Sequence, residues 1–279
     1  MNNYIKTLYT QCSNYLDTNF TESTFDKLPT SQQHDRLAEL RFTKKFIDVN
    51  IIDRHVSYEG LDIKLKPIGR PCRKTTDGWA EYVCAHQECN NGIPVPFNDA
   101  DEDELLLRIT SVIHSKNKKI ISDISKGIVK YNEPIILCVN IDQICNVGSR
   151  YDIFLMNKLE GNLPSVVRTV YPISKLTAKI NVTHPEKSSL GRDYNRFLVK
   201  AKTGTEISQA VFLDKEYAQI SAVLFNSNQL GYHFILIHNC FAKNPIRRKL
   251  LSNCLEYIPS LTPCIGGKCL HIKEVYTDE

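Results

Sequence analysis

Residues 134–141 read Pro-Ile-Ile-Leu-Cys-Val-Asn-Ile, an apolar run that only Asn140 interrupts. Such a run is typical of a β-strand that is covered on both faces in the middle of a sheet. In residues 101–120, just before it, apolar residues recur every three or four positions, which predicts a long amphipathic helix. A helix that leads into a buried central strand indicates an α/β fold.

Helices and strands are predicted on both sides of this pair. Residues 1–18 and 32–47 carry apolar residues at helical spacing. Residues 62–66 alternate polar and apolar side chains, and residues 79–85 read as a buried strand after the hairpin turn signal Asp77-Gly78. Further strands are expected at residues 50–56, 151–156, 166–171, 220–225 and 232–238. This order predicts a central mixed sheet flanked by helices.

The composition is that of an ordinary globular protein, with 42% hydrophobic and 24% charged residues in a chain of 279. We expect a helical lead-in at residues 1–30, an α/β core at residues 31–242 and a basic C-terminal tail at residues 243–279. No apolar run approaches the ~20 residues of a membrane helix, and the first residues lack the apolar core of a signal peptide. A cytoplasmic protein without a membrane partner is therefore expected.

Charge is distributed unevenly along the chain. The formal net charge of +4 is too small to indicate nucleic acid by itself. Positive charge nevertheless gathers at residues 116–130 and again at residues 243–249. Acidic side chains gather at residues 99–104, where we expect a helix to begin, because carboxylates stabilise the positive end of the helix dipole.

Ten cysteines occur in a chain with no visible export signal, which favours reduced thiols over a disulfide framework. Two Cys/His clusters stand out, Cys84-x-His86-x2-Cys89 and Cys264-x4-Cys269-x-His271. Neither has the paired cysteine spacing of structural zinc sites. We therefore expect reduced cysteines and no bound zinc.

Three carboxylates fall on elements that an α/β core could bring together. Glu39 lies on the first core helix, Asp62 opens a strand and Glu81 lies inside the next one. Carboxylate oxygens from such positions can hold one or two hard divalent cations, which can activate water for attack on a phosphodiester. The alternative is structural, because Asp62 also suits a turn after Gly60. Likewise, Glu81 in an apolar strand would need a partner such as Arg108.

These segments resemble the PD-(D/E)XK nuclease superfamily, and within it a poorly characterised bacterial branch. The matching pieces are Tyr58-Glu-Gly-Leu-Asp62, Trp79-Ala-Glu81-Tyr-Val83, Leu105-Leu-Leu-Arg108-Ile-Thr-x3-His-Ser-Lys116 and Ile237-His-Asn-Cys-Phe-Ala242. The resemblance covers residues 31–242 and implies a restriction-endonuclease-like core with magnesium-dependent cleavage of nucleic acid. It implies that Asp62 and Glu81 hold the metal and that Glu39 matches a helical Glu found in some members.

Two positions depart from the family pattern. Leu61 stands where the family has Pro, and Val83 stands where it has the charge-stabilising Lys. Lys116 on the following helix is a candidate for a relocated Lys, which completes a catalytic set with Glu39, Asp62 and Glu81. Arg108, Lys116 and Lys119 are the candidate nucleic-acid contacts on that helix. The alternative is a charged helix face that is merely solvated.

Two functions follow from these observations. The first is a diverged PD-(D/E)XK-like protein that is a weak magnesium-dependent nuclease or a nucleic-acid binder, and the basic helix face favours it. The second is a catalytically inactive interaction or regulatory protein, such as a bacterial host-directed factor with a protein partner, and Val83 favours it. His238-Asn239, at the end of a predicted strand, is either a polar site pair or a pair that satisfies loop backbone.

Overall fold

The computed structural model of the chain describes fourteen separate stretches. These are residues 3–12, 22–48, 57–58, 61–62, 99–127, 129–140, 163, 165–171, 177–180, 197–199, 206–208, 211–226, 234–264 and 267–277. The expected strands at residues 50–56, 79–85 and 151–156 lie outside these stretches.

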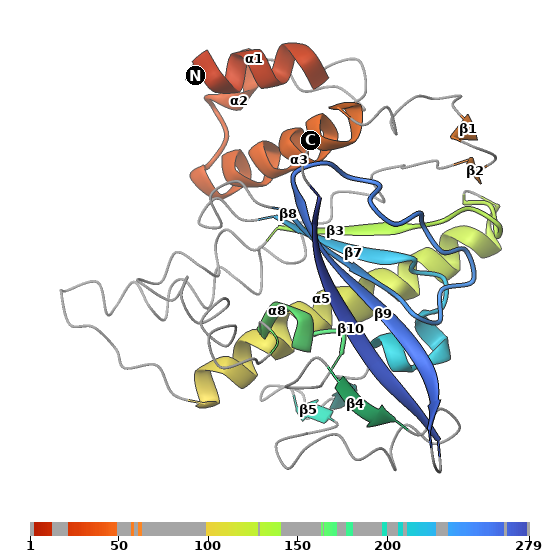
Figure 1. Cartoon of the computed structure of the whole chain (residues 1–279). Helices are drawn as coiled ribbons and strands as arrows, with labels where there is room; N and C mark the ends of the chain where they lie inside the picture. The colour runs from red at the N-terminus through yellow and green to blue at the C-terminus, as the bar shows by residue number, and fades with distance from the viewer. Residues whose placement is uncertain are drawn as a thin grey trace.

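A six-stranded mixed sheet forms the centre of the molecule (Figure 1). Its order is β3 (Ile136–Asn140), β7 (Ala222–Asn226), β8 (Phe234–His238), β9 (Cys254–Cys264), β10 (Gly267–Thr277) and β4 (Thr177–Ile180). The β3–β7 and β8–β9 pairs are parallel, and the other three pairs are antiparallel. The predicted α/β class with a mixed sheet and helices is confirmed.

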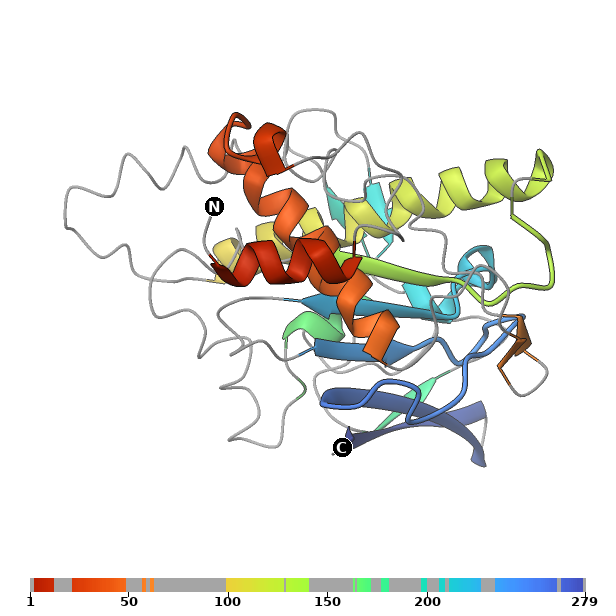
Figure 2. The ribbon, with the colours of Figure 1, turned by 90° about the horizontal axis from the view of Figure 1, so that it is seen from above.

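One long helix covers each face of the sheet (Figures 1 and 2). On one face, α5 (Asp99–Ser125) packs Ile109, Ile113 and Ile120 into the larger core. On the other face, α3 (Thr30–Asp48) packs Ala38, Phe42 and Phe46 into a second core. Successive side chains of a strand point to opposite faces, so an apolar residue is needed at every position of a strand between two helices.

β3 shows this two-sided burial directly. Ile136 faces the α3 core, whereas Leu137 and Val139 face the α5 core. The prediction of a strand covered on both faces is thus confirmed, but β3 lies at the edge of the described sheet and not at its centre. Two covering helices require the same continuous apolar run from an edge strand as from a central one.

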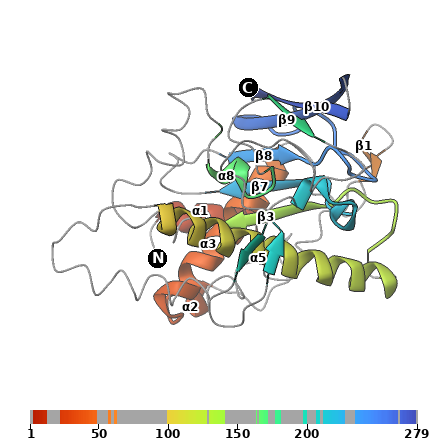
Figure 3. The same ribbon diagram turned by 90° about the horizontal axis from the view of Figure 1, so that it is seen from below.

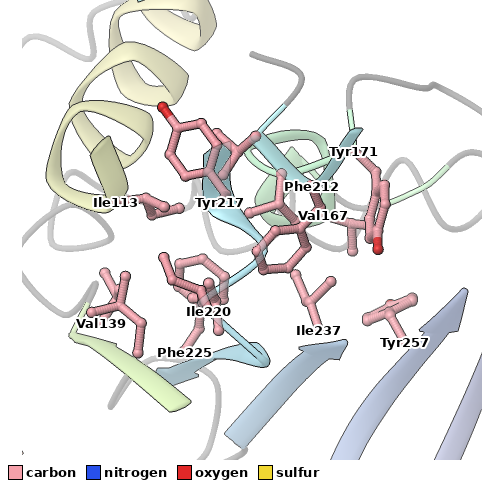
Figure 4. Close-up of a cluster of buried hydrophobic side chains, with 14 of the residues drawn as sticks. Ile113, Val139, Val167, Tyr171, Phe212, Tyr217, Ile220, Phe225, Ile237 and Tyr257 are labelled. Carbon is pink, nitrogen blue, oxygen red and sulfur yellow. The ribbon is translucent and has the colours of Figure 1, made fainter. Parts of the chain in front are cut away.

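The larger core extends from α5 to short elements beyond the sheet. Tyr171, Phe212 and Tyr217 are among the largest fully buried side chains of this core. Figure 4 shows the rings of this cluster between α5 and the strands. They come from α8 (Ser165–Arg168) with its following turn, from η3 (Val211–Leu213) and from η4 (Lys215–Tyr217).

The expected strand at residues 166–171 is wrong. Residues 165–168 are helical, and Val166, Val167, Val170 and Tyr171 are all buried in the larger core. A short apolar run that is buried on every side has no period, so its pattern cannot distinguish a strand from a helical turn.

The N-terminal lead-in packs on α3. In this part of the chain, α1 (Asn3–Cys12) and α2 (Glu22–Phe25) place Leu8, Cys12 and Phe25 against Leu40 of α3. Two small antiparallel pairs complete the described elements. They are β1 (Ser57–Tyr58) with β2 (Leu61–Asp62), and β5 (Phe197–Val199) with β6 (Glu206–Ser208).

Most of the expected C-terminal tail belongs to the sheet. β9 and β10 form an eleven-residue antiparallel ribbon, and β9 also pairs with β8 through residues 254–257. Pro259 and Pro263 argue against a strand at residues 254–264 in the sequence, because a proline inside a central strand removes a ladder hydrogen bond. Both prolines lie past the stretch that pairs with β8, so that edge of β9 requires no N–H donor from them.

We predict that a chain ending at Asn253 does not fold cooperatively. The deletion removes β9 and β10 and exposes the edge of β8, together with the core that Tyr257 and Leu270 help to fill. Urea denaturation followed by circular dichroism measures this, with a chain ending at Thr277 as the control. A cooperative transition of the shortened chain at the control's midpoint would show that residues 254–277 are dispensable.

Candidate functional site

The three predicted metal-site carboxylates are only partly placed by the structure. Glu39 lies on α3 and Asp62 ends β2, but their side chains and the whole of Glu81 lie outside the described part. β2 pairs with β1 in a separate two-stranded sheet, with Asp62 opposite Ser57, and is not a strand of the six-stranded sheet. The convergence of Asp62 and Glu81 therefore stays a prediction. Within the described stretches, no three His, Cys, Asp or Glu side chains gather around one metal position.

The predicted basic contacts on α5 differ in exposure. Lys119 is exposed, whereas Lys116 is buried, with only 6% of its surface accessible. The side chain of Arg108 lies outside the described part. A large polyanion needs an accessible ammonium group, so this arrangement favours Lys119 over Lys116 as a surface contact. Because Lys116 is buried, its ammonium group is better placed to interact with groups inside the protein than with a nucleic acid at the surface.

Asn239 satisfies loop backbone. Its Nδ2 donates to the carbonyl oxygens of Tyr217 (3.0 Å) and Ile220 (2.8 Å), and its Oδ1 accepts from the N–H of Phe241 (2.9 Å). The side chain is buried. One amide thus ties the turn after β8 to the segment before β7 through two hydrogen bonds and closes the turn through the third, which is the structural alternative left open by the sequence.

His238, in contrast, faces a buried carboxylate. Its Nε2 lies 3.4 Å from Oε2 of Glu256 on β9, and the two residues are 7% and 0% exposed. The same Oε2 accepts a hydrogen bond of 2.9 Å from the N–H of Lys249, whereas Oε1 has no hydrogen-bond partner among the described groups. The pair connects the end of β8, the start of β9 and the segment between them. Sequence reasoning singled out His238 but gave no reason to connect it with Glu256.

The thiol of Cys240, two residues after His238, is not activated. Tyr171 donates its hydroxyl to the carbonyl of His238 (2.7 Å) and accepts from the N–H of Cys240 (2.9 Å). Burial raises the pKa of Cys240 to about 11, so the side chain is a neutral thiol near pH 7. The nucleophilic form of cysteine is the thiolate, so His238 and Cys240 do not make a nucleophilic pair. All six cysteines in the described stretches are free thiols.

Two basic segments that lie far apart in the sequence meet at one end of the sheet. Ile136, Ala222 and His238 are aligned across β3, β7 and β8, so β8 ends where β3 begins. Asn244, after β8, donates its Nδ2 to the carbonyls of Tyr131 (2.8 Å) and Glu133 (3.2 Å), before β3. Figures 1, 2 and 3 show the end of α5 and the segment after β8 at this same end.

We call this surface the basic end. It is defined by the exposed side chains of Lys126, Lys130, Lys243, Arg247, Arg248 and Lys249. Lys243 places its Nζ 4.6 Å from the centre of the Tyr131 ring, a cation–π contact that joins the two segments through their side chains. The sequence showed both basic clusters, but their meeting depends on strand register.

Comparison with family models, curated proteins and solved structures finds no match. None of the described helices combines the length and the apolar character required to cross a membrane.

We predict that Asn239→Ala lowers the free energy of unfolding by about 2–4 kcal/mol, because it leaves buried backbone groups without partners. Asn239→Asp should not recover the loss, since the buried carboxylate would face the carbonyl oxygens of Tyr217 and Ile220 without a donor for them. Chemical denaturation measures both variants, with Asn132→Ala at an exposed position as the control. Equal stability of Asn239→Ala and the control would contradict the assigned role.

We also predict an alkaline loss of stability through Cys240. A thiol whose pKa is raised on folding binds its proton more tightly in the folded state, so its contribution is complete below the unfolded pKa of about 8.5. The contribution, up to about 3 kcal/mol, is lost as the pH rises towards 11. Denaturation with reductant at pH 8 and pH 10.5 should show a smaller decline for Cys240→Ala than for the wild type. An equal decline in both would contradict the prediction.

Proposed function

We propose that the protein binds nucleic acid through the basic end. The observation that supports this most is the contact of Asn244 and Lys243 with Tyr131, which joins two basic segments into one surface. Either segment alone is an ordinary solvated run of charge. Together they carry six exposed cations, and Lys243 contacts Tyr131 across the two segments.

A surface of exposed lysine and arginine side chains binds phosphate groups. Lys and Arg neutralise phosphates and release condensed counterions, which supplies most of the affinity of sequence-independent nucleic-acid binding. Polar contacts to the backbone hold the basic segments in place, because Asn244 spans Tyr131 and Glu133. A surface that is fixed before binding loses less side-chain and loop freedom on association.

Cleavage is the second half of the proposal, and it rests on the resemblance to PD-(D/E)XK nucleases. In this reading the α/β scaffold is a diverged restriction-endonuclease-like core, and Asp62 and Glu81 hold Mg²⁺ with Glu39 in support. Lys116 would offset charge from a buried position. With Val83 in place of the family Lys, one electrostatic donor is missing, and such a loss costs about 10²–10³ in rate. Cleavage should therefore be slow.

The competing function is a non-enzymatic interaction or regulatory protein. Val83 favours it, because a scaffold that has lost its charge-stabilising Lys can persist for binding alone. This protein would bind a macromolecular partner and show no metal-dependent turnover.

We predict that Lys130→Ala/Arg248→Ala weakens binding to nucleic acid and lowers the slope of log K against log salt by about one to two. Fluorescence anisotropy at several salt concentrations measures this. The matched control is Lys268→Ala/Lys273→Ala, two exposed lysines on β10 outside the basic end. Equal effects of the two double variants would mean that the basic end is not the binding surface.

For cleavage, we predict that Asp62→Asn and Glu81→Gln abolish turnover with Mg²⁺ or Mn²⁺ but keep binding. A gel assay with labelled substrate, with and without chelator, follows turnover, and anisotropy follows binding. If the wild-type protein binds nucleic acid but does not cleave it with either metal, the protein is a binder and the catalytic half fails. If it neither binds nor cleaves, the interaction protein takes first place.

A further inference from the structure

Tyr131 is the most exposed of the large hydrophobic side chains in the described stretches, at 59%. A single exposed aromatic ring is common on protein surfaces and by itself needs no explanation. Tyr131 differs because it lies next to Lys130 in sequence and beside Lys243 in space, two cations of the basic end.

The backbone that carries this ring is fixed from two sides. The turn is closed by the N–H of Glu133, which donates to the carbonyl of Lys130 (3.2 Å), and by Glu133 Oε2, which accepts from the N–H of Lys130 (3.3 Å). From the other segment, Asn244 donates to the carbonyl of Tyr131 itself. The ring is therefore presented by an ordered turn.

Two lysines, Lys130 in sequence and Lys243 in space, flank the ring. The ammonium group of Lys243 lies 4.6 Å from the ring centre, which leaves a phosphate near the ring within reach of Lys243 while a base contacts the ring. An aromatic side chain beside cations that track a backbone is how sequence-independent proteins hold single strands, because every base has a face that can stack.

We propose that Tyr131 stacks against an unpaired base, so that the basic end binds single-stranded nucleic acid in preference to duplex. This inference rests on the proposed nucleic-acid binding and names its substrate class. In a duplex both faces of each internal base are already stacked, and a rigid turn such as this one reaches only the phosphates. The cations can thus contact the phosphates of both single strands and duplexes, whereas the ring can stack only on the unpaired bases of a single strand.

The test compares three labelled probes of equal phosphate number: an oligothymidine, a blunt-ended duplex without a loop and an abasic strand. The wild-type protein should bind the oligothymidine most tightly at each salt concentration. Tyr131→Ala should weaken binding of the oligothymidine by about 5- to 100-fold and leave the other two probes unchanged. The salt slope should stay the same, because no phosphate contact is lost.

Two further variants separate stacking from other roles. Tyr131→Phe keeps the aromatic face and should bind like the wild type. Tyr276→Ala removes another exposed tyrosine, 47% accessible on β10, and should have no effect. Thermal unfolding of each variant confirms that the fold is retained, as expected for exposed positions.

The outcomes distinguish this inference from the function on which it rests. If Tyr131→Ala weakens all three probes equally, or weakens none, the stacking role is wrong while nucleic-acid binding stands. If the wild-type protein binds the duplex as tightly as the oligothymidine, the preference is wrong. If it binds none of the probes at low salt, both proposals fall, and the non-enzymatic interaction protein becomes the favoured function.

Discussion

The parallel pairing of β8 with β9 is the constraint on which the rest of the described structure depends. Parallel neighbours cannot be joined by a tight turn, so the chain must return along the length of the sheet between them. Residues 239–253 make that return. They place Ile246, Leu250 and Leu251 in the α3 core, and the amine of Lys45 on α3 contacts the carbonyls of Ser252 and Asn253. The basic segment at residues 243–249 is therefore part of a packed connection.

The polar contacts along this connection explain how its charged surface is held. Asn239 satisfies the turn after β8, and Asn244 ties the segment to the start of β3. Glu256 holds the N–H of Lys249, a residue with a positive φ of 55°, and faces His238 across the strand pair. The Asn244 contact joins residues that lie far apart in the sequence. The Glu256 contact stabilises the strained backbone conformation of Lys249. The backbone that carries the cations of residues 243–249 is thereby held next to the turn that carries Tyr131.

Hydrophobic patterns predicted the elements that the two long helices cover. The runs at residues 134–141, 220–225 and 232–238 correspond to β3, β7 and β8, and the helical spacing predicted α3 and α5. The hydrophobic pattern gave a wrong or missing prediction at two places, β9 and residues 166–171. Two prolines hid β9, and an apolar run buried on all sides made residues 166–171 look like a strand. The pairing of His238 with Glu256 and of Asn244 with Tyr131 could not be predicted, because both depend on strand order and register.

The central claim is that residues 126–133 and 243–249 act as one nucleic-acid surface. Ultraviolet cross-linking of the protein to a photoreactive oligonucleotide, followed by mass spectrometry of the digested peptides, tests it most directly. We expect cross-linked peptides from both segments in the same sample, with Tyr131 among the modified residues. Cross-links confined to one of the two segments, or found only elsewhere in the chain, would contradict this account.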